Sequence, residues 1–285
     1  MKNILLCCLA ILISTIVPAQ YFYNDLVGSA ETMRLMKSYR DNKVRTVSAT
    51  GYDRNNVKAT DFIEFHEVKD NGMTLKITNR DATSHSVTHH RFNAGGRLVT
   101  TVDSTGIQLN TLSYEYDSNG RITRIENKST NPSDEFNITE VHSWIYKTDG
   151  RPEKMWRILS GTNYVKPDSI EIRFVPDDMG NTGDEVTFRN NRETGRVYYY
   201  YDDKGRMTDI VRFNTKLNRL LPDVMFEYDD KDRVIQKITT TSDRVTAYLI
   251  WRFVFDSRGL KTKEALFDNN KQLTGKIDYA YTFGY

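Results

Sequence analysis

The histidines are the first residues in this sequence whose type and spacing could support chemistry. His85, His89 and His90 stand close together, and His66 and His142 lie elsewhere in the chain. In a β-strand, His85 and His89 would share one face while His90 would point to the other. A metal site needs three or four converging ligands, and no carboxylate stands at a useful spacing to complete this set. We therefore expect neither a metal ion nor another cofactor.

Carboxylates could serve a glycoside hydrolase as general acid and general base. Most candidates, however, occupy one recurring position in a turn, namely Asp117, Asp202, Asp229 and Asp256. The acidic, glycine-rich segment 177–184 is reminiscent of a calcium loop but lacks its regular alternation, so we interpret it as a plain turn. We expect no catalytic residues and no enzyme activity. An enzyme that acts on glycans is the least favoured alternative.

Aromatic side chains are the best candidates for a binding site. Tyr198, Tyr199 and Tyr200 belong to a run of four tyrosines, and Tyr248 and Trp251 follow later in the chain. Consecutive residues of a strand point to opposite faces, so some of these rings could be exposed and could contact a glycan or a partner protein at a cell surface. The alternative is that the rings pack across strands and only hold the sheet together.

A repeated unit positions these residues. Its second aromatic recurs with a period of about 27 residues, which is typical of a copied supersecondary unit. The positions are Phe92, Tyr116, Tyr146, Phe174, Tyr201, Tyr228, Phe255 and Tyr281. The alternating residues before each aromatic predict a strand, and the Asp-x-x-Gly that follows predicts a tight turn with a left-handed glycine. The sequence thus predicts an all-β antiparallel meander of hairpins that forms a curled or wrapped sheet.

The repeat also resembles a known family. Residues 114–122 and 199–207 carry Tyr-x-Tyr-Asp-x-x-Gly-Arg followed by an apolar residue. This pattern resembles the RHS, or YD, repeat, and the resemblance covers residues 91–285. It implies a secreted or surface β-hairpin scaffold that carries no catalytic residues. In large toxins such repeats wrap into a hollow shell around a cargo domain, but this chain has a longer period and too few units to enclose one.

The first residues have the features of a secretory signal. Residues 4–17 are uncharged and mostly apolar, and this run is shorter than the roughly 20 residues of a membrane-spanning helix. We interpret residues 1–19 as a signal peptide. Its removal takes away Cys7 and Cys8, so the mature chain has no disulfide or thiol chemistry.

The next segment differs from the repeats. We expect residues 20–45 to form an N-terminal cap with a short helix, N-capped by Ser29, whose apolar residues Leu35, Met36 and Tyr39 cover the first strand. Residues 46–285 would then form the β-hairpin repeat domain.

Charge and composition suggest where the protein acts. The net charge is only +2 and no basic stripe occurs, so nucleic acid is not an expected partner. We expect an exported, non-catalytic scaffold with a binding or structural role, extracellular, at the cell surface or in the periplasm. The alternative is an outer-membrane β-barrel, because residues 277–285 alternate strictly and end on an aromatic. Charges on both faces of segments 121–126 and 151–156 argue against a lipid-facing surface.

Overall fold

The structure is a computed structural model, and it describes residues 21–131, 137–215, 217–240 and 248–284. One helix, α1 (Asn24–Asp41), precedes the strands, and a short 3-10 turn, η1 (Asp70–Gly72), follows the second strand. The strands in the described residues are β1 (Val44–Asp53), β2 (Ile63–Lys69), β3 (Thr74–Arg80), β4 (His85–Phe92), β5 (Leu98–Thr105), β6 (Leu109–Tyr116), β7 (Ile122–Thr130), β8 (Asn137–Tyr146), β9 (Pro152–Gly161), β10 (Asp168–Pro176), β11 (Thr182–Arg189), β12 (Arg192–Tyr201), β13 (Met207–Asn214), β14 (Arg219–Tyr228), β15 (Val234–Thr240), β16 (Tyr248–Phe255), β17 (Lys261–Phe267) and β18 (Leu273–Phe283).

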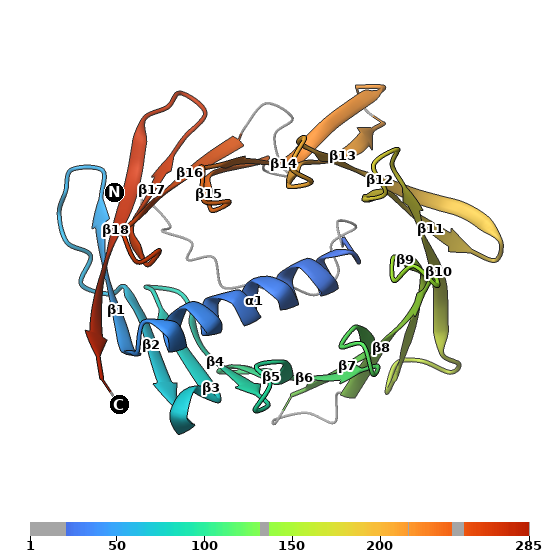
Figure 1. The fold of residues 1–285 in the computed structure, drawn as a ribbon, viewed down its shortest axis with the longest axis horizontal. Coiled ribbons are helices and arrows are strands. Elements are labelled where there is room, and N and C mark those ends of the chain that lie inside the picture. The colour runs from blue at the N-terminus through green and yellow to red at the C-terminus, as the bar shows by residue number, and fades with distance from the viewer. Residues whose placement is uncertain (1–20, 132–136, 216, 241–247, 285) are drawn as a thin grey trace.

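The strands form one closed sheet. Each strand pairs antiparallel with the next along the chain, and β18 pairs back with β1, for example Tyr281 with Val47. In Figure 1 the 18 strands of the described residues form an oval ring. The predicted all-β meander is confirmed. The expectation of a curled or wrapped sheet is corrected, because the accumulated twist brings the first and last strands together into a barrel.

The tight turns have the geometry that the repeat predicts. In the turn after β6, Gly120 N–H donates to the Asp117 carbonyl at 3.0 Å, and Asp117 Oδ1 accepts the backbone N–H of Arg121 at 2.9 Å. Gly120 has a φ of +81°, which favours glycine. Asp232 replaces the glycine in a later turn and adopts a φ of 60°, a conformation that aspartate tolerates better than most residues.

Helix α1 lies inside the ring rather than over the end of an open sheet (Figure 1). It begins at Asn24, so the predicted N-cap at Ser29 is wrong, and the Ser29 hydroxyl instead donates to the Asp25 carbonyl within the helix. Met36 and Tyr39 are buried in one cluster with Val47 of β1, as expected, whereas Leu35 is 36% exposed. In the described part of the chain, no helix is both long and apolar enough to cross a membrane.

The inner face of the barrel packs against the helix. Phe22, just before α1, belongs to one apolar cluster with Trp144 of β8, and Met36 belongs to another with Leu75 of β3. Because strand residues alternate, the neighbours of these inner residues point outward. The apolar core therefore lies inside the ring, between the helix and the wall.

Gly96→Val should destabilise the protein more than Gly95→Val. Gly96 has a φ of +81°, and a Cβ atom there would lie 2.7 Å from Arg40 Nη2, whereas at Gly95 the nearest atom, Asn93 Oδ1, would be 3.4 Å away. A β-branched residue in the left-handed region costs about 1–3 kcal/mol. Thermal melting followed by circular dichroism should show the lower Tm for Gly96→Val. Equal Tm values for the two variants would show that we have misplaced the register of this turn.

Candidate functional site: the junction between the helix and the barrel wall

Five tyrosine hydroxyls join a hairpin to the preceding one at the end of the barrel that carries the tight turns. Each donates to a backbone carbonyl that stands two residues after a turn glycine, at 2.6–2.9 Å. The pairs are Tyr116 with Leu98, Tyr146 with Ile122, Tyr201 with Thr182, Tyr228 with Met207 and Tyr281 with Lys261. Because donor and acceptor come from consecutive hairpins, these bonds help to set the position of one repeat on the next.

The arginine after the turn glycine adds a second contact between consecutive hairpins. Arg121 Nε donates to Asp117 of its own turn at 2.7 Å, and its Cζ atom lies 4.7 Å from the centre of the Tyr146 ring in the next repeat. One guanidinium thus combines an ion pair with a cation–π contact. We refer to these tyrosine and arginine contacts together as the turn ladder.

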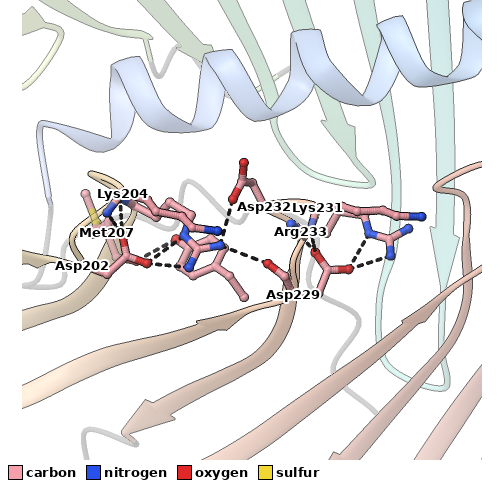
Figure 2. A network of polar contacts seen from close by, with 9 residues as sticks. Asp202, Lys204, Met207, Asp229, Lys231, Asp232 and Arg233 are labelled. Carbon is pink, nitrogen blue, oxygen red and sulfur yellow. Dashed lines mark hydrogen bonds and ion pairs between the residues drawn. The ribbon is translucent and has the colours of Figure 1, made fainter.

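Figure 2 shows part of the turn ladder, at the turns after β12 and β14. Arg206 donates hydrogen bonds to Asp202 of its own turn at 2.7 Å and to Asp232 of the next turn at 2.8 Å. Its Cζ atom lies 4.7 Å from the centre of the Tyr228 ring. Arg233 repeats the arrangement one unit later, over Phe255 at 4.8 Å.

The ladder arginine is replaced at two of the tight turns between residues 93 and 260, and both replacements lie where the helix meets the wall. Asn181 stands in its place before Tyr201, and Tyr201 packs with Tyr23 at the start of the helix. Leu260 stands in its place in the turn after β16 and belongs to one apolar cluster with Tyr39, near the end of the helix. These two departures from the repeat mark the positions of the two helix ends.

The wall supplies the N-terminal cap that the helix lacks. Tyr23, at the start of α1, makes no capping bond with its side chain. Glu185 of β11, only 1% exposed, accepts the backbone N–H of Tyr23 and the hydroxyl of Tyr199, each at 2.8 Å. Burial raises the pKa of Glu185, and these donors oppose that rise. Tyr21 extends the junction by donating to Asp223 at 2.6 Å.

Charged side chains meet at the first turn of the helix. Asp25 Oδ2 lies 2.6 Å from His142 Nδ1 and accepts a hydrogen bond from Trp144 Nε1 at 3.2 Å. His142 Nε2 lies 2.7 Å from Glu140 Oε1, and the second oxygen of Glu140 accepts from Arg157 at 2.7 Å. We call these five residues the Asp25 cluster.

The protonation states of the Asp25 cluster follow from its charges. Burial lowers the pKa of His142, but Asp25 and Glu140 outweigh burial and raise it to about 9. Burial raises the pKa of Glu140, but hydrogen bonds from His142 and Arg157 outweigh it and lower the pKa to about 2. At neutral pH, the imidazole is therefore protonated and held between carboxylates. Such a network is suited to fixing the helix in place rather than to transferring protons.

The C-terminal end of the helix has a smaller junction. The Tyr39 hydroxyl lies 2.9 Å from His66 Nδ1, and His66 Nε2 lies 3.2 Å from Glu64 Oε1. Arg40 packs against the turn at Gly72, where a Cβ atom would lie 2.6 Å from its side chain. Both ends of the helix are thus tied to the wall by polar contacts as well as by apolar packing.

The aromatic residues predicted as ligand contacts divide between the two faces of the wall. Tyr199 and Trp251 are only 4% and 7% exposed, on the inner face, so these two are not among the exposed rings. Strand alternation is the reason, because it places Tyr198 and Tyr200 on the outer face. Tyr248 also points outward. The structure therefore does not bring the five rings together.

Two depressions in the wall contain predicted residues. Tyr198 lines a cleft of about 490 Å³ together with Arg196 and Phe213. Tyr248 lines a groove of about 390 Å³ together with Arg252 and Lys271. Any contact of these tyrosines with a ligand stays a prediction.

The other residues considered for chemistry take structural positions. His90 of β4 faces inward and lies 2.9 Å from Thr101 Oγ1, while His89 faces outward, as strand alternation predicts. The acidic segment 177–184 begins with a tight turn, in which Gly180 N–H donates to the Asp177 carbonyl at 3.0 Å.

Sequence reasoning missed the Asp25 cluster and the cap at Glu185. The repeat contained a signal for the cluster. Most units carry an apolar residue four positions before the second aromatic, such as Leu112, Ile170 and Val197. One unit carries His142 at that position. A polar residue at a core-facing position of a repeat indicates a specific buried partner. The identity of that partner, Asp25, required the structure.

Comparisons with known proteins place the chain in no family. No family model matches it, and no curated protein matches it. Among solved structures, it is similar to the Tc holotoxin pore of Photorhabdus luminescens, with 13% identity, a TM-score of 0.32 and coverage of 78% of this chain but 12% of the toxin chain. Porin-like proteins from Bacteroides uniformis and Bacteroides vulgatus are 9% and 10% identical, with TM-scores of 0.34 and 0.35, and coverage is 84% of this chain and 98% of each of theirs. These weak similarities carry no argument about function, and the RHS resemblance stays an interpretation.

Leu260→Ala should destabilise the protein far more than Leu220→Ala. Leu260 is 1% exposed at the helix junction, whereas Leu220 is 44% exposed on the outer wall. Removing a buried leucine side chain costs about 2–5 kcal/mol, and changes at the surface usually stay within about 0.5 kcal/mol. Urea unfolding should separate the two variants clearly. Similar midpoints would mean that the helix is not packed on this turn.

The stability of the protein should fall between pH 6.5 and pH 9. The pKa of His142 rises from 6.5 to about 9 on folding, so its stabilisation is complete below pH 6.5 and is lost as the pH approaches 9. His142→Gln should be less stable at pH 6, and its free energy of unfolding should lose the downward slope between pH 6.5 and pH 9. The outward-facing His89→Gln is the matched control and should keep it. An unchanged slope in His142→Gln would refute the proposed ion network.

Proposed function

We propose that this chain is an exported, non-catalytic β-barrel that folds around its own N-terminal helix and acts in water, extracellular, at the cell surface or in the periplasm. Its role would be to bind a glycan or a partner protein through its outer face. The observation that carries the proposal is the charged outer surface of the wall at the middle of its strands.

Ion pairs lie along the outer face of several strands. On β7, Glu126 contacts both Arg124 and Lys128, with its Oε1 atom 2.8 Å from Lys128 Nζ. On β10, Arg173 Nε lies 2.9 Å from Glu171 Oε1. These residues alternate with inner residues such as Ile125 and Ile172, so they point away from the helix.

The same pattern occurs on other sides of the ring. Arg196 of β12 pairs with Asp184 of β11 at 2.6 Å, and Lys76 of β3 pairs with Glu67 of β2 at 3.3 Å. In a lipid-facing wall, each Arg or Lys at mid-bilayer would cost about 2–4 kcal/mol. A wall with such residues on several sides is suited to water.

The inner face supports the same proposal. Outer-membrane barrels place apolar residues outside and polar residues inside. Here Trp144 and Leu75 point inward and belong to the apolar clusters around the helix. An apolar core thus lies on the face that is polar in a lipid-embedded barrel, although the Asp25 cluster and Glu185 share that inner face.

The absence of enzyme activity is part of the proposal. Several buried ionisable groups, namely His142, Glu140 and Glu185, already have partners that tie the helix to the wall. Groups engaged in this way are not free to take or give protons at a substrate.

An outer-membrane barrel is the second candidate, and one observation favours it. The described residues form a closed antiparallel meander with an even number of strands, the topology of bacterial outer-membrane barrels. In that case the outer ion pairs would lie outside the hydrocarbon layer or against another protein.

Extraction from cells separates the two candidates. When the chain with its signal is expressed in a Gram-negative host, osmotic shock should release it without detergent, because its outer wall is compatible with water. A resident outer-membrane barrel of the host is the control and should stay in the membrane pellet after a carbonate wash. Extraction by detergent alone would overturn the proposal.

A pair of charge substitutions sharpens this test. Ile158, in the interior of β9, is 37% exposed on the outer face, so Ile158→Arg should leave the yield and Tm unchanged in water. In lipid it should cost about 2–4 kcal/mol. Ile125→Arg, on the buried inner face, should prevent folding with either candidate and serves as the matched control.

A further inference from the structure

We propose that the groove on the outer face of β14, β15 and β16 binds a short saccharide that carries a carboxylate, as uronic acids do. This inference rests on the proposed function, because it needs an outer wall that meets water, and it adds the chemical class of the glycan. Four features of the groove support it: an apolar floor, an oriented tyrosine, two cations and a suitable volume.

The floor of the groove is a row of three apolar side chains. Met225 of β14 stands opposite Ile238 of β15, and Ile238 stands opposite Ile250 of β16, so the three residues form one cross-strand row. All three line the groove, whose volume is about 390 Å³. This volume lies at the lower end of the usual range for small-molecule sites, about 300–1,000 Å³. The groove is therefore of a size for a small ligand.

Tyr248 supplies an aromatic wall. Its hydroxyl donates to the Asn269 carbonyl at 3.2 Å, which holds the ring in place beside the floor. An oriented tyrosine combines an apolar ring face with a polar tip. Such a surface suits the C–H face of a sugar, which is flat and weakly apolar but surrounded by hydroxyl groups.

The charges that line the groove have one sign. Arg252 and Lys271 are the charged side chains among the described residues that line it. On another part of the outer wall, Arg196 pairs with the carboxylate of Asp184, but Arg252 donates from Nε to the neutral amide oxygen of Gln236, at 2.9 Å. The positive charge of Arg252 is thus not neutralised by this partner. An anionic ligand would complement it.

The guanidinium of Arg252 is also held in position. Gln236 fixes its Nε, and its Cζ lies 5.1 Å from the centre of the Phe267 ring. An oriented guanidinium suits the two oxygens of a carboxylate, to which it can donate two parallel hydrogen bonds. Because the site also offers a ring and an apolar floor, it favours a carboxylated sugar over a bare phosphate ion or an acidic peptide.

Calorimetry on the mature full-length protein tests the inference. Trimers of galacturonic, glucuronic and mannuronic acid are the ligands, and neutral hexose trimers, inorganic phosphate and triglutamate are the comparisons. At least one uronic acid trimer should bind clearly more tightly than all comparison ligands. Equal binding of a neutral trimer, of phosphate or of triglutamate would overturn the proposal, as would no binding of any uronic acid trimer.

Variants locate the binding site. Arg252→Gln and Tyr248→Ala should each weaken binding by about tenfold or more, because a charge-assisted hydrogen bond or a ring contact is lost. Tyr248→Phe should retain most of the affinity, since it keeps the ring. Arg196→Gln, at the other cleft, is the matched control and should bind like the unmodified protein. Unchanged binding in Arg252→Gln, with an unchanged Tm, would place the ligand elsewhere.

Failure of this inference differs from failure of the proposed function. A protein that osmotic shock releases but that binds no uronic acid trimer refutes only the ligand class. A protein that needs detergent for extraction refutes the water-facing barrel and, with it, the basis of this inference.

Discussion

A barrel of this many strands encloses more space than the side chains of its own wall can readily fill, and the rest of the structure depends on that constraint. Barrels of 16 to 18 strands generally leave a channel, whereas protein interiors are otherwise closely packed. Here α1 occupies the ring, and Phe22 and Met36 bring apolar surface to clusters on the inner wall. The helix thus supplies part of the core that the sheet lacks.

The turn ladder explains how the repeats keep their order around the helix. The tyrosine hydroxyls and ladder arginines such as Arg121 join consecutive hairpins, so most repeats are positioned by a neighbour along the chain. Asn181 and Leu260 depart from the arginine position at the helix ends. Local exceptions to the repeat thus provide the positions at which a single, non-repeated element, here the helix, packs on the wall.

The buried charges at the helix junction favour specificity as much as stability. Removing Asp25 and His142 from water costs free energy, which their mutual contact and the hydrogen bond that His142 donates to Glu140 offset. An unpaired member of this cluster would be strongly unfavourable. The cluster therefore favours one position of the helix along the wall, which apolar packing alone would specify less sharply.

Local features were predictable from the amino-acid sequence because they depend on neighbouring residues. The Asp117 turn, the left-handed Gly96 and Asp232, and the alternation of strand faces follow from backbone geometry within a few residues. The candidate site was predicted only in part, since the tyrosines at 198 and 248 face outward but Tyr199 and Trp251 do not. Assigning each ring to a face needed the register of every strand.

Three features were decided only by the tertiary structure: barrel closure, the place of the helix and the Asp25 cluster. Closure pairs Val47 with Tyr281, at opposite ends of the described chain, and depends on small twists summed over all the strands. The helix and the Asp25 cluster likewise depend on contacts such as that between Asp25 and His142, which are remote in sequence. The sequence by itself determined the repeating hairpin, because its signals are short-range. Tertiary structure determined what the hairpins enclose, because that depends on long-range packing.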